Sequence, residues 1–169
     1  MIMIIDFFQD ALFASIAAIG FASISNPPRK AYRYCALIAA VGHSIRFLLM
    51  LSGGVEMHIV AATALASFVT GMVAVLFSTR AKMPAETFLF PSLLPMIPGI
   101  YAYKTFGGLV MCLYGSNEAE FLHALYLFAD NGLTCLFILL GLVIGANSPI
   151  FLLKKISFRA TRRSFHRKL

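Results

Sequence analysis

The chain has 169 residues, of which 60% are hydrophobic and only 12% are charged, and its mean hydropathy is +0.85. An average soluble domain carries about 25% charged residues, so this composition excludes an ordinary soluble domain and predicts an integral membrane protein. The net charge of +7 does not indicate a nucleic-acid-binding protein, because seven of the fourteen Lys and Arg residues lie in the last 16 positions, where lipid headgroups can attract them.

Five apolar segments are predicted, and they cover residues 4–25, 34–51, 57–78, 87–113 and 121–146. Each is long enough to cross a bilayer, which takes about 20 residues in an α-helix. Backbone groups in lipid must form hydrogen bonds within their own segment, so each segment is expected to be helical. We therefore predict an all-α polytopic membrane bundle of five transmembrane helices. It forms one domain over residues 1–147, and a basic tail follows over residues 148–169.

The first segment contains Asp6 and Asp10, and it lacks the positively charged leader of a secretory signal. It is therefore expected to be retained as the first span. The two acids lie one helical turn apart near its expected outer end, where we interpret them as an exposed helix face, with a gate as the alternative. Small residues recur every fourth position in this and later segments. Such stripes predict close helix packing, either within the chain or between chains. They are Ala14, Ala18 and Ala22, then Ala66, Thr70 and Ala74, and finally Gly141 with Gly145.

The second segment contains His43 and Arg46, which are three residues apart and therefore share one face of a helix. An ionisable group inside a span costs about 2.5–3.5 kcal/mol on insertion scales, so each one needs a reason. For a helix that begins near Tyr34, His43 lies about 14 Å into the span, near the middle of a core about 30 Å thick. Arg46 lies one turn further out, and it either reaches the outer headgroups or serves a functional site.

The fourth segment contains Pro91, Pro95 and Pro98, and Gly99 follows the last proline. Proline donates no backbone hydrogen bond and clashes with the preceding turn, so three prolines in close succession predict a broken helix. Broken helices occur at membrane depth where protein or a water-filled cavity surrounds them, and transporters use them as substrate sites. A helix restarting after Pro98 and Gly99 would offer free N–H groups to a carboxylate. The alternative is a simple proline kink.

Two further ionisable residues follow this break. Lys104 has three open interpretations, namely an ion pair with Asp130, a contact with substrate, or a position at the outer interface. Asp130 lies near mid-depth in the fifth segment, in a polar turn with Asn131 and Thr134. A buried carboxylate is easily neutralised, so Asp130 is predicted to couple proton movement to transport, with a protonated structural aspartate as the alternative.

The orientation in the membrane follows from the basic residues of the connections. Arg29, Lys30 and Arg33 precede or begin the second segment, Arg80 and Lys82 follow the third, and the remaining two connections contain no Lys or Arg. The positive-inside rule therefore predicts an N-terminus outside and a C-terminus in the cytoplasm. The tail is predicted to form an amphipathic helix on anionic lipid headgroups, with a dedicated partner site as the alternative.

Two stretches carry a family resemblance, RYCALIAAVGHSIRFLLM in the second segment and FPSLLPMIPGIYAYK in the fourth. Together they resemble the small membrane subunit of the two-component threonine/serine exporter (ThrE-like) family, over most of the five segments. The resemblance implies a subunit that works with a separate, larger membrane subunit. It also implies export of small polar metabolites, either threonine and serine or dicarboxylates such as succinate. The matching motif positions are His43, Arg46, Pro91, Pro95, Pro98, Gly99 and Tyr101.

The leading hypothesis is a subunit of a secondary exporter for carboxylate-bearing metabolites in a bacterial inner membrane. No nucleotide-binding loop is present, so an ion or proton gradient is expected to drive export, unless efflux is facilitated. Substrate binding is assigned to Arg46, Lys104, Pro98, Gly99 and Tyr101, and proton coupling to His43 and Asp130.

The alternative is a non-transporting membrane subunit that stabilises or localises a larger partner through its small-residue stripes. An enzyme is not predicted, because the spacing shows no catalytic dyad and no metal-binding pair. The three cysteines also lie in apolar segments without ligand spacing, so we predict no metal and no other cofactor.

Overall fold

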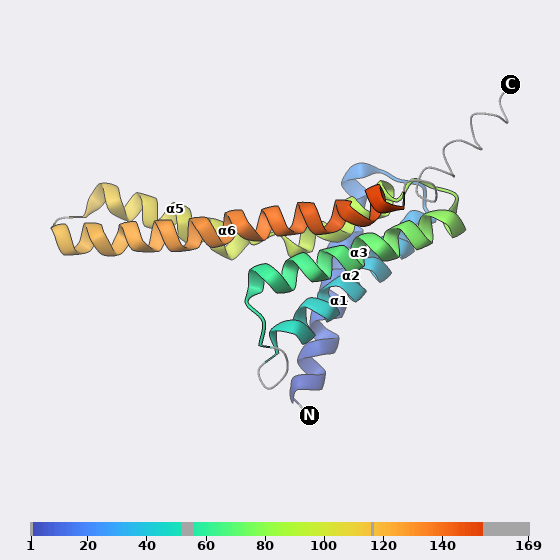
Figure 1. Cartoon of the computed structure of the whole chain (residues 1–169), viewed down its shortest axis with the longest axis horizontal. Coiled ribbons are helices and arrows are strands. Elements are labelled where there is room, and N and C mark those ends of the chain that lie inside the picture. The colour runs from blue at the N-terminus through green and yellow to red at the C-terminus, as the bar shows by residue number, and fades with distance from the viewer. Residues whose placement is uncertain (1, 52–55, 116, 154–169) are drawn as a thin grey trace, which may run out of the picture. The chain divides into compact units, whose positions relative to one another are not determined.

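The computed structural model describes residues 2–51, 56–115 and 117–153, and its regular elements in these ranges are all helices (Figure 1). The prediction of an all-α protein is therefore confirmed for the described residues. Residues 154–169 lie outside them, as does the helix predicted for that part of the tail. The elements are α1 (Ile2–Ser25), α2 (Ala31–Met50), α3 (Ile59–Ala81), α4 (Glu86–Leu93), the 3-10 helix η1 (Leu94–Met96), α5 (Gly99–Tyr114) and α6 (Glu118–Leu152).

Four of these helices, α1, α2, α3 and α6, are long and apolar enough to cross a membrane. A fifth span is obtained if α4, η1 and α5 are counted together. The first three helices match the predicted segments to within a few residues, whereas α6 extends beyond its predicted segment at both ends. Local apolar length therefore gave the position of the helices well, and their ends less well.

The predicted fourth segment consists of α4, η1 and α5 rather than one continuous α-helix. Pro91 lies inside α4 and Pro95 inside η1, while Pro98 immediately precedes α5. Pro98 has φ −78° and ψ 60°, and the N–H of Gly99 donates to the carbonyl of Ile97 at 2.8 Å. These values describe an inverse γ-turn. The N–H of Gly99 is thus already occupied, and the free donors expected at this helix start begin one residue later.

Pro91 is accommodated inside α4 by side chains from α2 and from α4 itself. A proline removes the helical donor to the carbonyl four residues earlier, which here belongs to Thr87. The thiol of Cys35 lies 3.9 Å from that carbonyl oxygen and supplies a weak donor. The hydroxyl of Ser92 lies 2.7 Å from the carbonyl oxygen of Phe88 and 2.9 Å from that of Cys35. Neighbouring polar groups therefore hold the proline-containing turn against α2, as expected for helix-breaking residues in membranes.

The chain divides into two compact units. The first unit contains α1 to α4, η1 and the part of α6 from Gly141 onward, and the second contains α5 and the part of α6 up to Leu140. In the second unit the two helices form an antiparallel hairpin. A Cβ added to Gly108 would lie 2.7 Å from the backbone nitrogen of Phe128, and one added to Gly132 would lie 3.2 Å from Cγ2 of Thr105. Glycine therefore lets the two helices approach closely.

The small-residue stripes of the first unit are used inside the chain. A Cβ added to Gly145 would overlap the carbonyl oxygen of Ala64 and the hydroxyl of Ser67, so α6 and α3 can pack only with glycine at this position. Whether such stripes serve contacts within or between chains was left open by the sequence, and here they serve contacts within it. The buried stripe residues of α1 and α3 are Ala14, Ala18, Ala22, Ala66, Thr70 and Ala74.

Aromatic contacts gather the start of α2, the end of α3 and the start of α4 at one end of the first unit. The ring of Tyr34 lies 5.2 Å from that of Phe77 and 5.3 Å from that of Phe88, centroid to centroid. The guanidinium of Arg33 lies over the same tyrosine at 5.1 Å. The first connection precedes α2 and the third lies between α3 and α4, and both are basic. These two connections therefore lie at the same end of the unit.

Candidate functional site

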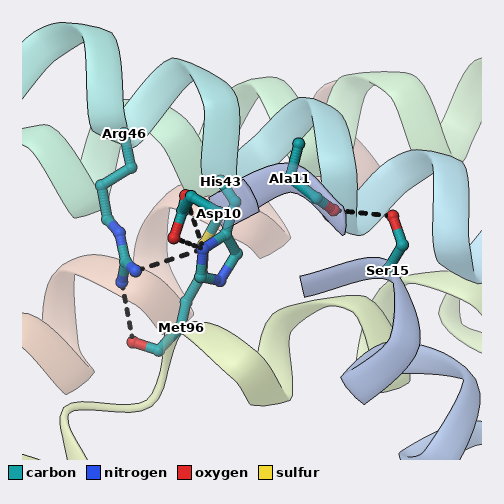
Figure 2. Close-up of polar contacts among 6 residues, drawn as sticks. All are labelled: Asp10, Ala11, Ser15, His43, Arg46 and Met96. Atoms are coloured by element: carbon teal, nitrogen blue, oxygen red, sulfur yellow. Dashed lines mark hydrogen bonds and ion pairs between the residues drawn. The ribbon is translucent and has the colours of Figure 1, made fainter. Parts of the chain in front are cut away.

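Three ionisable side chains meet where α1, α2 and η1 pack together in the first unit (Figure 2). Nδ1 of His43 lies 3.2 Å from Oδ2 and 3.4 Å from Oδ1 of Asp10. One guanidinium nitrogen of Arg46 lies 3.3 Å from the same Nδ1. The other donates to the backbone carbonyl of Met96 at 3.4 Å. The cluster thus connects an acid on α1, a base and a cation on α2, and the last residue of η1.

His43 and Arg46 share a face of α2, as the three-residue spacing predicted. The helix that carries them, α2, begins at Ala31 and ends at Met50. At 1.5 Å per residue His43 lies about 18 Å from its first residue and about 10 Å from its last, and the depth of His43 in the membrane stays a prediction. Arg46 points into the cluster, where its guanidinium contacts His43 and the carbonyl of Met96.

Asp10 was missed by the sequence interpretation, which grouped it with Asp6 as an exposed helix face. Asp6 is exposed, but Asp10 is only partly exposed and contacts His43. A signal for this was present in the sequence, because Asp10 lies one turn before Ala14 and so continues the stripe that is buried against α2. Extending a small-residue stripe by one turn to look for a polar residue would have found it.

The imidazole of His43 is enclosed, since the residue is only 5% exposed. Its second ring nitrogen, Nε2, is buried and has no hydrogen-bond partner among the described residues. A buried polar atom without a partner costs about 1–3 kcal/mol, so this nitrogen is an unusual feature that a purely structural histidine would avoid.

Packing around the cluster fixes the backbones that carry it. A Cβ added to Gly42 would overlap Oγ1 of Thr70 and would lie 2.6 Å from Cε of Met96, so α2 fits closely against α3 and η1 beside His43. On the other side, the hydroxyl of Ser15 lies 2.8 Å from the carbonyl oxygen of Ala11 and 3.1 Å from that of Ala36, which links α1 to α2. Close helix contacts therefore hold Asp10 and His43 in register.

Of the remaining predicted site residues, Pro91 and Pro95 lie in the first unit, and the others lie in the second. Lys104 and Asp130 are both exposed, and no hydrogen bond or ion pair joins them within the described residues. In the polar turn of α6, Asn131 is buried and its amide donates to the carbonyl of Leu127 at 2.8 Å. Of the residues at the start of α5, Pro98 is buried, Tyr101 is partly buried and Gly99 is exposed.

The first-unit cluster combines three kinds of polar group. The carboxylate of Asp10 and the guanidinium of Arg46 carry opposite charges, and the imidazole of His43 lies between them. Within the described residues there is no group of three or more His, Cys, Asp and Glu side chains that could hold a metal ion.

Comparison with known proteins identifies the family of the chain, and a relative is described here from among the matching proteins. The family model described as "Threonine/Serine exporter, ThrE" matches residues 10–151. A protein of Haemophilus influenzae described as an uncharacterized protein is 37% identical over 149 residues, which cover 88% of this chain and 48% of the relative. The chain thus spans about half the length of that relative. No solved structure matches the chain.

Proposed function

The chain belongs to the threonine/serine exporter (ThrE) family, and we propose that it is one subunit of a secondary exporter in a bacterial inner membrane. The chain is a multi-pass membrane protein, and its family is one of transporters. The proposed substrate is a small carboxylate-bearing metabolite, either a hydroxy amino acid or a C4 dicarboxylate. The proposed driving force is a proton gradient.

The observation that carries this proposal is the contact of Asp10, His43 and Arg46 inside apolar helices. Ionisable groups within a span are costly, and they mark substrate paths and proton relays in pumps and carriers. A structural ion pair would not need the titratable ring between its two charges. We therefore assign proton coupling to His43 and carboxylate binding to Arg46.

The second unit supplies further groups of the same chemical types. α5 begins at Gly99, directly after the turn at Pro98, and the N-terminus of a helix attracts carboxylates through its free N–H groups and its dipole. We propose that this helix start, with Tyr101 and Lys104, takes part in substrate binding. Asp130 is proposed as a second proton-coupling residue. Pro91 and Pro95 belong to the discontinuous segment that precedes this helix start.

A larger membrane subunit is the proposed partner. The chain spans about half the length of its Haemophilus influenzae relative, which is what a single half of a longer exporter would do. Lys104 and Asp130 are exposed on the hairpin, and exposed charges in a span need protein or water around them rather than lipid. We propose that the larger subunit contributes to that surrounding. The basic tail is proposed to bind anionic lipid headgroups on the cytoplasmic side.

The proposed orientation places the N-terminus outside and the C-terminus in the cytoplasm. It is supported by the first and third basic connections, whose helix ends share the aromatic contacts of Tyr34. The rule that basic loops face the cytoplasm then applies to one end of the first unit as a whole.

The test is efflux from cells that contain this chain alone, the larger subunit alone, or both. Hydroxy amino acids and C4 dicarboxylates are supplied in turn, and release is measured with Arg46→Ala and with the exposed control Arg80→Ala. We expect release only from cells with both subunits, lost in Arg46→Ala and kept in Arg80→Ala. Efflux by the chain alone would remove the need for a partner, and normal efflux from Arg46→Ala would remove the proposed site.

A non-transporting role remains the second candidate. In that case the two subunits would co-purify, and no substrate would be released whichever cluster residue is present. The small-residue stripes would not form its contact surface, because those of α1 and α3 are buried inside the first unit.

A further inference from the structure

The cluster in the first unit contains a conflict at one atom. Nδ1 of His43 lies 3.2 Å from a carboxylate oxygen of Asp10 and 3.3 Å from a guanidinium nitrogen of Arg46. A carboxylate only accepts hydrogen bonds, and a guanidinium only donates them. Nδ1 can donate to Asp10 when it carries a proton, or accept from Arg46 when it carries a lone pair, but it cannot do both.

We propose that His43 is a two-position proton switch and that Asp10 is its positioning residue, which attracts the proton to Nδ1 and away from the contact with Arg46. The role of this switch in transport rests on the proposed function, whereas the protonation of the ring does not depend on it. In the first position the neutral ring carries its proton on Nε2 and accepts from Arg46. In the second, one proton from water has added to the Nδ1 lone pair, and the resulting imidazolium donates to Asp10.

Hydrogen bonds at the second ring nitrogen of His43 do not favour either protonation state over the other. Nε2 has no partner among the described residues, so it gains no hydrogen bond in either position. The balance is therefore decided at Nδ1, between one acceptor and one donor. Among the described elements packed on α1 and α2, the ionisable side chain of α3 is Arg80 in its last turn, and η1 consists of Leu94, Pro95 and Met96. α4 contributes Glu86 in its first turn, and the other acid of α1 is the exposed Asp6.

Exposure indicates how a proton reaches the ring. The side chain of Asp10 is 34% exposed, whereas that of His43 is 7% exposed. Asp10 and Arg46 are both partly exposed, whereas His43 is buried. Of the two partly exposed groups only the carboxylate can accept a proton, and in the proposed switch it takes one from water and passes it to Nδ1. Asp10 then returns to the charged form that holds the imidazolium, and the net change is one added proton.

The switch is linked to the discontinuous segment through Arg46. Its guanidinium also donates to the carbonyl of Met96, the residue that comes just before Ile97 and Pro98. When Nδ1 takes up a proton, Arg46 loses one acceptor and faces a new positive charge, so its contact with Met96 must change. A proton at His43 thereby alters what Arg46 can bind, either the end of η1 or an incoming carboxylate.

The test reads the ring directly, by ¹⁵N NMR of the full chain in lipid nanodiscs with labelled histidine. The Nδ1 and Nε2 shifts together distinguish the imidazolium, which is protonated on both nitrogens, from a neutral ring that is protonated on one of them, and the His43 signal is identified by its loss in His43→Gln. At a fixed pH near neutrality we expect the ratio of imidazolium to neutral ring to fall about tenfold in Asp10→Asn, because a charge-assisted hydrogen bond is lost. It should rise in Arg46→Gln and stay unchanged in the control Asp6→Asn.

The signals of His58 and His123 show whether each variant is folded, and Arg46→Gln gives a second measurement if Asp10→Asn is not. Equal protonation in the wild type, Asp10→Asn and Arg46→Gln would overturn the switch. Efflux supplies the separate readout. Asp10→Asn should move the pH profile of efflux to lower pH, whereas a merely structural role would lower efflux equally at every pH. Ring protonation that follows both variants without efflux at any pH would support the switch and overturn the proposed function.

Discussion

The ionisable residues predicted for the site are clustered in the first unit and separate in the second. In the first unit Asp10, His43 and Arg46 contact one another, and the carbonyl of Met96 completes the set. In the second unit Lys104 and Asp130 are exposed, and they do not pair with each other. Both units are built from apolar helices, so the difference does not come from composition.

The comparison indicates that the charges of the cluster are compensated within the first unit, whereas we propose that Lys104 and Asp130 of the hairpin need groups from outside it. Charges within a span are stable only when protein, water or an opposite charge surrounds them. The cluster is therefore the part of the chain whose chemistry can be studied in the isolated subunit. The hairpin is the part expected to change its behaviour when a partner is present.

The largest effect is expected from Asp130→Asn, which tests whether the exposed carboxylate has a role in transport. If it couples proton movement to export, the variant should show no efflux, while the protein still inserts and co-purifies with the larger subunit. Glu118→Gln, at the start of the same helix, is the matched control and should keep efflux. Normal efflux from Asp130→Asn would break the comparison, because the exposed charge would then have no role in transport.

A smaller effect is expected from Gly145→Ala, which tests the close packing of the first unit. The added Cβ would overlap the carbonyl of Ala64, and overpacking typically lowers the free energy of unfolding by about 1–3 kcal/mol. Gly107→Ala in α5 is the control, because a Cβ there meets no atom within 4 Å. Thermal unfolding in detergent, followed by circular dichroism, should show a lower midpoint for Gly145→Ala only. Equal midpoints would mean that this helix contact is looser than described.

The smallest effect is expected from Ser15→Ala, which removes the hydroxyl that links α1 to α2. Hydrogen bonds between membrane helices contribute about 0.6 kcal/mol on average, so the unfolding midpoint should fall only slightly. Ser23→Ala is the control, since its hydroxyl bonds within α1 to the carbonyl of Ile19. The same two variants also sharpen the account of the cluster, because Ser15 keeps Asp10 in register with His43. If the unfolding midpoint fell equally in Ser15→Ala and Ser23→Ala, the hydrogen bond between α1 and α2 would not be the cause.

Much of the fold could be predicted from the sequence because the bilayer constrains it locally. Apolar length and the need to satisfy backbone groups are properties of each segment, and they located all five helical regions. The prolines indicated where the fourth region is discontinuous. They did not show that Pro91 fits inside α4 with help from Cys35, because that contact joins residues far apart in the sequence.

The candidate site was only partly predictable. His43 and Arg46 stood out as ionisable residues in an apolar segment, and their shared face followed from helical spacing. Asp10 was assigned to an exposed face, because its position near the expected end of the first segment concealed its partner. Its contact with His43 joins two helices. The cost of a charge in a span indicates that a partner is needed, but it does not identify the residue that provides it.

The sequence by itself determined that this is an all-helical, multi-pass membrane protein, because hydropathy and backbone hydrogen bonding act within single segments. The tertiary structure alone decided that the small-residue stripes of α1 and α3 are buried in contacts within the chain and that Asp10 completes the cluster. Both depend on which helix faces reach one another, and close packing of small residues sets that only once the helices have assembled.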